Sequence, residues 1–377
     1  MGKTFLPHQI KFKKGYSHKV LAVHEGGSGK TYCGCLWLSD NRDSDALVIC
    51  NKRIIKKWQE SLKECGTKAT VVSKEQFKKL PVKQWSAIVV DEADEFASPL
   101  FTRQRSQLST TLYELIKKYP DMPIFLATAT PVRSSPANLH SILCFRGVYI
   151  PWKDWRNEFY TLERRPFLPR PAYFPVEGWR SKMRPILEKY ADIVLMKDII
   201  DVPVNPEPIF VKTPCSPFTA SVEVPKTFHN EHRHEQEGKY KAIRQIGKDF
   251  RKIIVVAYYV EQIEALQRAL SQNRETFMVH GQVKNQEAIL KQANEESDEC
   301  FLVVQASLGV SWDGDNFPCV VYASMSHKVR DYIQMGYRLT RIRNLHPVNE
   351  YHLWGGKWDK KVYETIKSGF DFIPSKW

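Results

Sequence analysis

The stretch HEGGSGKT, residues 24–31, decides the fold expected of this chain. It fits the pattern G-x-x-x-x-G-K-[ST] of a phosphate-binding loop except at its first position, where His24 stands in place of glycine. A short apolar run, VLAV at 20–23, precedes it as a buried strand would. A glycine-rich turn is the alternative, and the stretch alone does not exclude it.

The residue types within this stretch suit a bound phosphate group. Glycines allow the backbone to turn its N–H groups inward, Lys30 can reach the outer phosphates, and Thr31 offers a hydroxyl to Mg²⁺. The predicted phosphate cradle consists of Gly26, Gly27, Ser28, Gly29, Lys30 and Thr31.

A second motif, AIVVDEADEF at 87–96, is an apolar run that ends in two carboxylates. Asp91 is expected to complete the coordination shell of a metal ion, usually through water. Glu92 is expected to orient and deprotonate the attacking water. A single acidic residue at a strand end often caps the next helix instead, but the Asp-Glu pair in the same half as GSGKT favours the metal–nucleotide site.

Short apolar runs alternate with amphipathic segments along both halves, which predicts two α/β domains, each with a mainly parallel sheet covered by helices. The predicted strands are 20–23, 46–50, 69–72, 87–90, 123–128, 252–259, 276–280, 300–304 and 318–323. The predicted helices are 53–64, 108–119, 261–270, 285–295 and 328–341. Ligands of such sheets bind at the carboxyl ends of the strands, where HEGGSGKT, VDEAD and ATATP would lie.

The predicted domains are 1–205, which binds the nucleotide, and 206–377, with the join near 205–235 and the active site in the cleft between them. Residues 150–205 are rich in proline, arginine and aromatics and are predicted to form a helical extension of the first domain, with a helix across 179–196. Aromatic residues and arginines alternate from 152 to 182, which suits either base stacking or a packed aromatic subcore.

Composition indicates an ordinary soluble globular protein with 42% hydrophobic and 26% charged residues. The net charge of +14 would attract a polyanion, so nucleic acid is the first candidate partner, although a basic solubility surface is the alternative. The eight cysteines contain no C-x-x-C pair and are expected to be reduced core thiols. His229, His232 and His234 are expected to belong to a solvated linker rather than a metal site.

The chain shows neither an N-terminal signal peptide nor an apolar run long enough to span a bilayer. We therefore expect a cytoplasmic protein with no membrane partner.

The motifs HEGGSGKT, VVDEAD and LATATP, in this order, resemble those of superfamily 2 helicases and translocases. LPHQ at 6–9 resembles the N-terminal glutamine motif, and LVICNKRIIKKWQE the segment that holds a nucleic acid backbone. QASLGVSWDG at 305–314 resembles the fifth motif, and QMGYRLTR at 334–341 the sixth. The departures are Cys50-Asn51, Ser311 and Gly336, which sits one place early.

The resemblance implies two RecA-like domains in tandem that use ATP and Mg²⁺. It implies that Gln9 reads the adenine edge, and that Thr128, Thr130, Gly309 and Asp313 couple hydrolysis to DNA contact. Gln334, Arg338 and Arg341 would complete the catalytic site, with the arginines reaching the phosphates from the second domain. The implied nucleic acid contacts are Lys52, Arg53, Lys56, Gly281 and Lys284.

Within superfamily 2 the chain looks most like Swi/Snf-type proteins, through residues 179–216, GKYKAIRQI at 238–246 and GGKWDKKVYETI at 355–366. Its length predicts a minimal two-domain form of phage or mobile-element type. The resemblance implies a monomeric motor that moves along or unwinds DNA, with replication or recombination proteins as further partners.

Two rival functions fit the same motifs. The letters DEAD at 91–94 suggest an RNA helicase, although TAT stands where that family typically has SAT. The altered positions His24, Asn51, Ser311 and Gly336 suit a nucleotide-gated clamp that binds DNA without unwinding it.

Overall fold

The structure is a computed structural model, and its description covers most of the chain in segments. The described residues are 4–13, 16–40, 45–100, 105–132, 135–164, 170–199, 205–213, 233–308, 314, 316–326, 328–339, 346–355 and 357–368. They divide into two compact units, one within Met1–Ile199 and the other within Ile200–Phe370.

The first unit is built on a six-stranded sheet in the order β3-β2-β4-β5-β1-β8. Every neighbouring pair of strands in it is parallel. The strands are β1 (Lys19–His24), β2 (Leu47–Cys50), β3 (Thr70–Ser73), β4 (Ile88–Asp91), β5 (Ile124–Thr128) and β8 (Asp192–Val194). The carboxyl ends of all six therefore meet at one edge of the sheet.

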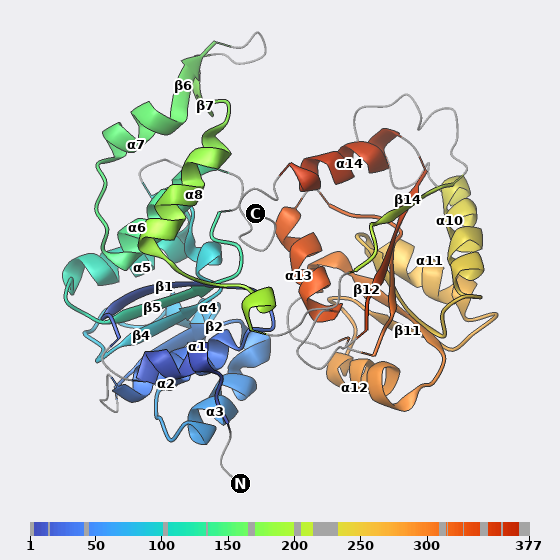
Figure 1. The fold of residues 1–377 in the computed structure, drawn as a ribbon, viewed down its shortest axis with the longest axis horizontal. Helices are drawn as coiled ribbons and strands as arrows, with labels where there is room; N and C mark the ends of the chain where they lie inside the picture. The colour runs from blue at the N-terminus through green and yellow to red at the C-terminus, as the bar shows by residue number, and fades with distance from the viewer. Residues whose placement is uncertain are drawn as a thin grey trace. The chain divides into compact units, whose positions relative to one another are not determined.

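Helices cover both faces of this sheet (Figure 1). Alternate residues of one strand point to opposite faces. Val89 of β4 therefore packs beneath α2 (Lys30–Asp40) and α3 (Ile55–Glu64), while Ile88 and Val90 pack beneath α5 (Gln107–Lys118) and α6 (Pro136–Arg146). The helices of the first unit are α1 (Pro7–Ile10), α2 (Lys30–Asp40), α3 (Ile55–Glu64), α4 (Lys74–Phe77), α5 (Gln107–Lys118), α6 (Pro136–Arg146), α7 (Trp152–Phe159) and α8 (Trp179–Tyr190). Its short 3-10 turns are η1 (Lys11–Lys13), η2 (Lys52–Ile54), η3 (Ala93–Phe96) and η4 (Met196–Asp198).

The segment expected to be a helical extension is only partly helical. Between α7 and α8 it forms an antiparallel hairpin of β6 (Tyr160–Glu163) and β7 (Ala172–Pro175). The helix predicted across 179–196 ends at Tyr190, because the β-branched pair Ile193-Val194 pairs with β1 as strand β8.

The aromatic residues of this extension are mainly packed. Trp155 and Phe159 are 2% and 0% exposed, and their ring centroids lie 4.5 Å apart. Trp152 packs against the buried His140, with ring centroids 5.3 Å apart. Trp155 and Phe159 therefore belong to a packed aromatic subcore, which is one of the two predictions for this stretch, the other being base stacking.

The second unit contains a six-stranded parallel sheet in the order β11-β12-β10-β13-β14-β9. Its strands are β9 (Ile209–Lys212), β10 (Lys252–Ala257), β11 (Thr276–Val279), β12 (Cys300–Gln305), β13 (Cys319–Tyr322) and β14 (Asn349–Trp354). Its helices are α10 (Arg233–Ile246), α11 (Val260–Leu270), α12 (Gln286–Lys291), the π-helical η5 (Gln292–Glu296), the 3-10 turn η6 (Ala306–Leu308), α13 (Val329–Leu339) and α14 (Lys357–Lys367).

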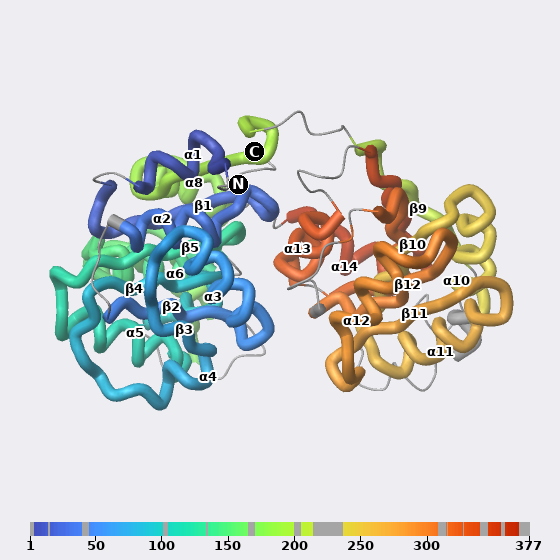
Figure 2. The backbone as a smooth tube through the Cα atoms, turned by 90° about the horizontal axis from the view of Figure 1, so that it is seen from below, coloured from blue at the N-terminus to red at the C-terminus, as the bar shows by residue number. Residues whose placement is uncertain are grey.

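Helices also cover both faces of the second sheet (Figure 2). Residues of α10 and α11 share one apolar cluster with Ile253 and Val255, while residues of α12 and α13 share another with Ile254 and Val256. The predicted fold class, two tandem RecA-like α/β domains with parallel sheets, is confirmed.

Within the described residues, no helix combines the length and the apolar character needed to cross a bilayer. The same residues contain no group of three or more His, Cys, Asp or Glu side chains placed to hold a metal ion. The described cysteines are all free. The predicted histidine linker is not tested, because His229 and His232 lie outside the described residues and so does the side chain of His234.

Candidate nucleotide site

The predicted nucleotide residues of the first unit gather at one edge of its sheet. Strands β4, β5 and β1 are neighbours, and their carboxyl ends carry Asp91, Thr128 and His24 respectively. This edge of a parallel sheet is where α/β proteins bind their ligands.

The loop after β1 has the backbone that a phosphate cradle requires. Gly27 and Gly29 have φ values of 88° and 84°, a left-handed region that favours glycine. Lys30, which begins α2, donates through Nζ to the backbone oxygens of His24 at 3.0 Å and Glu25 at 3.4 Å. The hydroxyl of Ser28 is buried and has no hydrogen-bond partner among the described residues. A free buried hydroxyl, a lysine ammonium and a helix N-terminus together fit the phosphates of a nucleotide.

Gln9 lies directly against this loop. Its side chain is 5% exposed, and Nε2 donates to the backbone oxygen of Ser28 at 3.3 Å. A Cβ added to Gly29 would clash with Gln9 Nε2, so a side chain there would displace the end of Gln9 from the loop. The structure thus brings the glutamine motif and the phosphate loop together, although the chain separates them by 19 residues.

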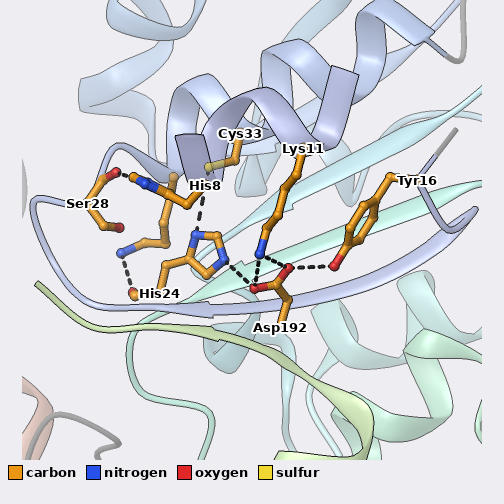
Figure 3. Close-up of polar contacts among 8 residues, drawn as sticks. His8, Lys11, Tyr16, His24, Ser28, Cys33 and Asp192 are labelled. Carbon is orange, nitrogen blue, oxygen red and sulfur yellow. Dashed lines mark hydrogen bonds and ion pairs between the residues drawn. The ribbon is translucent and has the colours of Figure 1, made fainter. Parts of the chain in front are cut away.

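His24, the residue that breaks the loop pattern, is fully buried at the end of β1, with its ring directed toward Cys33 and Asp192 (Figure 3). Its Nδ1 lies 3.8 Å from Cys33 Sγ, and its Nε2 lies 3.5 Å from Asp192 Oδ1. Burial lowers the pKa of His24 to about 4, against the opposing effect of the Asp192 carboxylate. The imidazole is therefore neutral near pH 7.

Asp192 is a site residue that sequence reasoning missed. Its carboxylate accepts from Lys11 Nζ at 2.8 Å and from the Tyr16 hydroxyl at 2.5 Å, as Figure 3 shows. Burial opposes ionisation, but the contacts with His24, Lys11 and Tyr16 outweigh it and hold the pKa of Asp192 below its usual range. This carboxylate fastens the segment that carries Gln9 to the strand that carries His24.

The acidic end of β4 is held in a defined orientation. Asp91 is 7% exposed, and its oxygens accept from the Trp58 indole at 2.9 Å and from the Glu92 backbone N–H at 3.0 Å. Glu92 has φ 53° and ψ 57°, a left-handed conformation that is uncommon for a residue other than glycine. Such backbone strain clusters at functional sites.

The ends of β4 and β5 are joined through side chains. The Thr128 hydroxyl donates to Asp94 Oδ1 at 2.9 Å and accepts from the Thr130 backbone N–H at 3.0 Å. All three residues are buried, and the Thr130 hydroxyl has no hydrogen-bond partner among the described residues. The acidic motif and the TAT motif therefore form one connected polar cluster.

The candidate nucleic acid contacts lie after the carboxyl ends of β2 and β11. Lys52, Arg53 and Lys56 are exposed where β2 leads into η2 and α3. In the second unit Gly281 and Lys284 are exposed after β11, and the backbone N–H of Gly281 donates to Gln305 Oε1 at 3.2 Å.

The sixth motif lies partly on α13. The orientation of the buried Gln334 amide is assigned from its hydrogen-bond surroundings. In that orientation, its side-chain oxygen accepts from Arg330 Nε at 2.9 Å. Arg338 follows one turn later, and its backbone oxygen accepts from Gly314 N at 3.0 Å. Gly309, Asp313 and Arg341 lie outside the described residues.

Comparison with known proteins relates part of the chain to a helicase domain. Residues 238–343 match the family model of the helicase conserved C-terminal domain. Among solved structures, the chain aligns with the Sulfolobus solfataricus SWI2/SNF2 ATPase core in complex with dsDNA, at 15% identity and a TM-score of 0.44, over 100% of this chain and 94% of that one. A search of curated proteins finds no match. The matched segment, residues 238–343 of the second unit, is therefore similar to the helicase conserved C-terminal domain.

Proposed function

We propose that this protein is a DNA-dependent ATPase of Swi/Snf-like type that hydrolyses ATP to move along, unwind or remodel DNA. The observation that carries the proposal is the match of residues 238–343 to the helicase conserved C-terminal domain, in a chain whose first unit has a glycine-rich loop before α2 that fits phosphate groups. The two observations are needed together, because phosphate loops occur in many ATPases and the loop alone would not indicate a DNA-dependent one.

The first unit would bind the nucleotide. Gly26, Gly27, Ser28 and Gly29 would direct backbone N–H groups at the phosphates, Lys30 would neutralise their outer charge, and Gln9 would recognise the adenine edge. Thr31 and Asp91 would hold Mg²⁺, which when bound offsets the charge on the phosphates.

Hydrolysis requires a base and compensation of the charge that develops. Glu92 would orient the attacking water and accept its proton, while Gln334, Arg338 and Arg341 would complete the site as the sixth motif implies. An arginine of this kind can contribute roughly 10³ to 10⁵ in hydrolysis rate. Thr128, Thr130, Gly309 and Asp313 would couple this step to DNA contact.

DNA is the proposed partner, held through its backbone by Lys52, Arg53 and Lys56 in the first unit and by Gly281 and Lys284 in the second. The net charge of +14 supports a polyanionic ligand. We further propose a cytoplasmic monomer of phage or mobile-element type that works with replication or recombination proteins.

The proposal is tested by ATPase assays at one fixed salt concentration with single-stranded DNA, duplex DNA or RNA, because salt controls every backbone contact. Stimulation by DNA well above that by RNA is expected. Loss of turnover in Arg338→Ala with retained nucleotide binding would support the finger role.

The same assay separates the rival functions. Stimulation by RNA alone would replace the proposal with an RNA helicase. Hydrolysis with neither strand displacement nor movement on duplex DNA would favour a nucleotide-gated clamp, the function that His24, Asn51, Ser311 and Gly336 keep open.

A further inference from the structure

Trp58 is a buried residue of α3 for which the motif roles provide no function. Its side chain is 1% exposed, and its indole N–H donates to Asp91 Oδ2 over 2.9 Å. The other oxygen of the same carboxylate accepts from the Glu92 backbone at 3.0 Å. Each oxygen of Asp91 thus has a fixed donor, and together the two donors set the plane of the carboxylate.

The indole also packs against the helix that begins at the phosphate loop. A Cβ added to Gly34 of α2 would lie 3.0 Å from Trp58 Cη2, which is closer than most side chains accept. The absence of a side chain at Gly34 therefore gives the indole room. Trp58 sits between α2, which starts at Lys30, and the carboxyl end of β4.

The segment that carries Trp58 presents basic side chains to solvent. Lys52 and Arg53 in η2 and Lys56 in α3 are exposed, whereas Trp58 faces the core. A polyanion that binds the exposed residues and shifts α3 would move the indole relative to Asp91. A rigid element that moved between two positions in this way would provide a physical route for coupling between the two sites.

We propose that Trp58 is a positioning residue that orients Asp91 for a Mg²⁺–nucleotide and transmits nucleic acid contact at α3 to that carboxylate. The proposal rests on the proposed function, since Asp91 is taken there as the carboxylate that supports the metal. An indole N–H can only donate, and a hydrogen bond to a carboxylate is stronger than one between neutral groups.

The test is Trp58→Phe, which keeps a buried aromatic ring and removes the N–H. Its matched control is Trp37→Phe, because Trp37 is equally buried and its N–H donates to the backbone oxygen of Ser17 at 3.1 Å. ADP binding is measured by calorimetry with Mg²⁺ and with EDTA, without nucleic acid. We expect Trp58→Phe to weaken Mg²⁺–ADP binding about 10-fold and leave ADP binding in EDTA unchanged.

Equal effects of the two substitutions on Mg²⁺–ADP binding would overturn the proposal. If Trp58→Phe does not fold, Gly34→Ala is used in its place, because the added methyl group displaces the indole and leaves the N–H; it is expected to weaken Mg²⁺–ADP binding and not ADP binding in EDTA. An unchanged Mg²⁺ dependence in Gly34→Ala would equally overturn it.

The coupling is tested by ATPase assays with duplex DNA. Trp58→Phe should lower DNA-stimulated hydrolysis more than basal hydrolysis, and an equal fall in both rates would remove the coupling from the proposal. A wild-type protein that no nucleic acid stimulates would contradict the proposed function, while the ADP measurements would still decide the role of Trp58.

Discussion

The Thr128 hydroxyl donates to the Asp94 carboxylate over 2.9 Å and so joins the end of β5 to the turn that follows β4. Asp94 is 1% exposed and Thr128 is fully buried. Because a buried carboxylate is costly to leave without its donors, this contact holds the two motifs in one arrangement.

Thr128→Val should test this contact, since valine keeps the shape of threonine and removes the donor. We expect a loss of about 1–3 kcal/mol in the free energy of unfolding, measured by urea denaturation. Thr110→Val is the matched control, because the Thr110 hydroxyl donates over 3.0 Å to the backbone oxygen of Ser106 and this bond is exposed to solvent. This substitution should cost less than about 0.5 kcal/mol. Equal losses in the two variants would argue against a special role for the Thr128–Asp94 pair.

If Thr128 also couples hydrolysis to DNA, Thr128→Val should retain basal ATPase activity and lose its stimulation by DNA.

Gly29→Ala should abolish nucleotide binding. Its φ of 84° disfavours a side chain, and the added Cβ would also displace Gln9. Gly66→Ala carries a similar conformational cost at φ 67°, but nothing lies within 4 Å of the added Cβ. Calorimetric titration with ADP should therefore show wild-type affinity in Gly66→Ala. Similar ADP affinities in Gly29→Ala and Gly66→Ala would show that the contact between Gln9 and the loop is not needed for nucleotide binding.

Lys30→Ala should eliminate ATP hydrolysis, because Lys30 is the only lysine or arginine among residues 24–31 and would offset the negative charge of bound phosphates. Glu92→Gln should instead bind ATP and fail to hydrolyse it, since the amide cannot accept the proton of the attacking water. Radiolabelled ATP retained on the protein after gel filtration separates the two outcomes. Normal turnover in either variant would contradict the assigned roles.

His24 should make the protein less stable in mild acid. Its pKa is about 4 in the folded protein and near 6.5 when unfolded, so between these values the unfolded chain binds the extra proton. The contribution of the neutral His24 to the free energy of unfolding is fully present above about pH 6.5. It is lost as pH falls toward 4, which lowers the free energy of unfolding by up to about 3 kcal/mol. The pKa of Asp192 is below its usual range, so that group matters only at lower pH.

His24→Asn should flatten the dependence of unfolding free energy on pH between 4.5 and 6.5, measured by urea denaturation at each pH. His140→Asn is the companion variant, because His140 is also buried with a lowered pKa but packs against Trp152 and Trp155. It should flatten the profile without changing nucleotide affinity. If the unfolding free energy of His24→Asn depends on pH as steeply as that of the wild type, another group causes the pH dependence.

The strands that bear the nucleotide residues were predictable from sequence, because they are buried on both faces and appear as continuous apolar runs bounded by polar turns. VLAV, AIVV and PIFLAT became β1, β4 and β5, and the parallel order placed their carboxyl ends together. The glycine pattern of HEGGSGKT likewise predicted a loop with residues in the left-handed conformation, and Gly27 and Gly29 adopt that conformation.

Strands β8, β9 and β14 could not be predicted in the same way. Strand β9 is largely exposed, β14 mixes polar and apolar residues, and β8 is only three residues long. Such segments carry little periodic signal, and they become strands because the exposed edge of a neighbouring strand offers hydrogen-bond partners.

The amino-acid sequence by itself determined the parallel α/β fold and the phosphate loop, because apolar runs and glycines act locally. Only the tertiary structure decided which side chains support that loop. Tyr16 meets Asp192 across 176 residues of chain, and Trp58 meets Asp91 across 33. No local pattern encodes these pairings, since each depends on where crossover connections and an edge strand bring distant residues together.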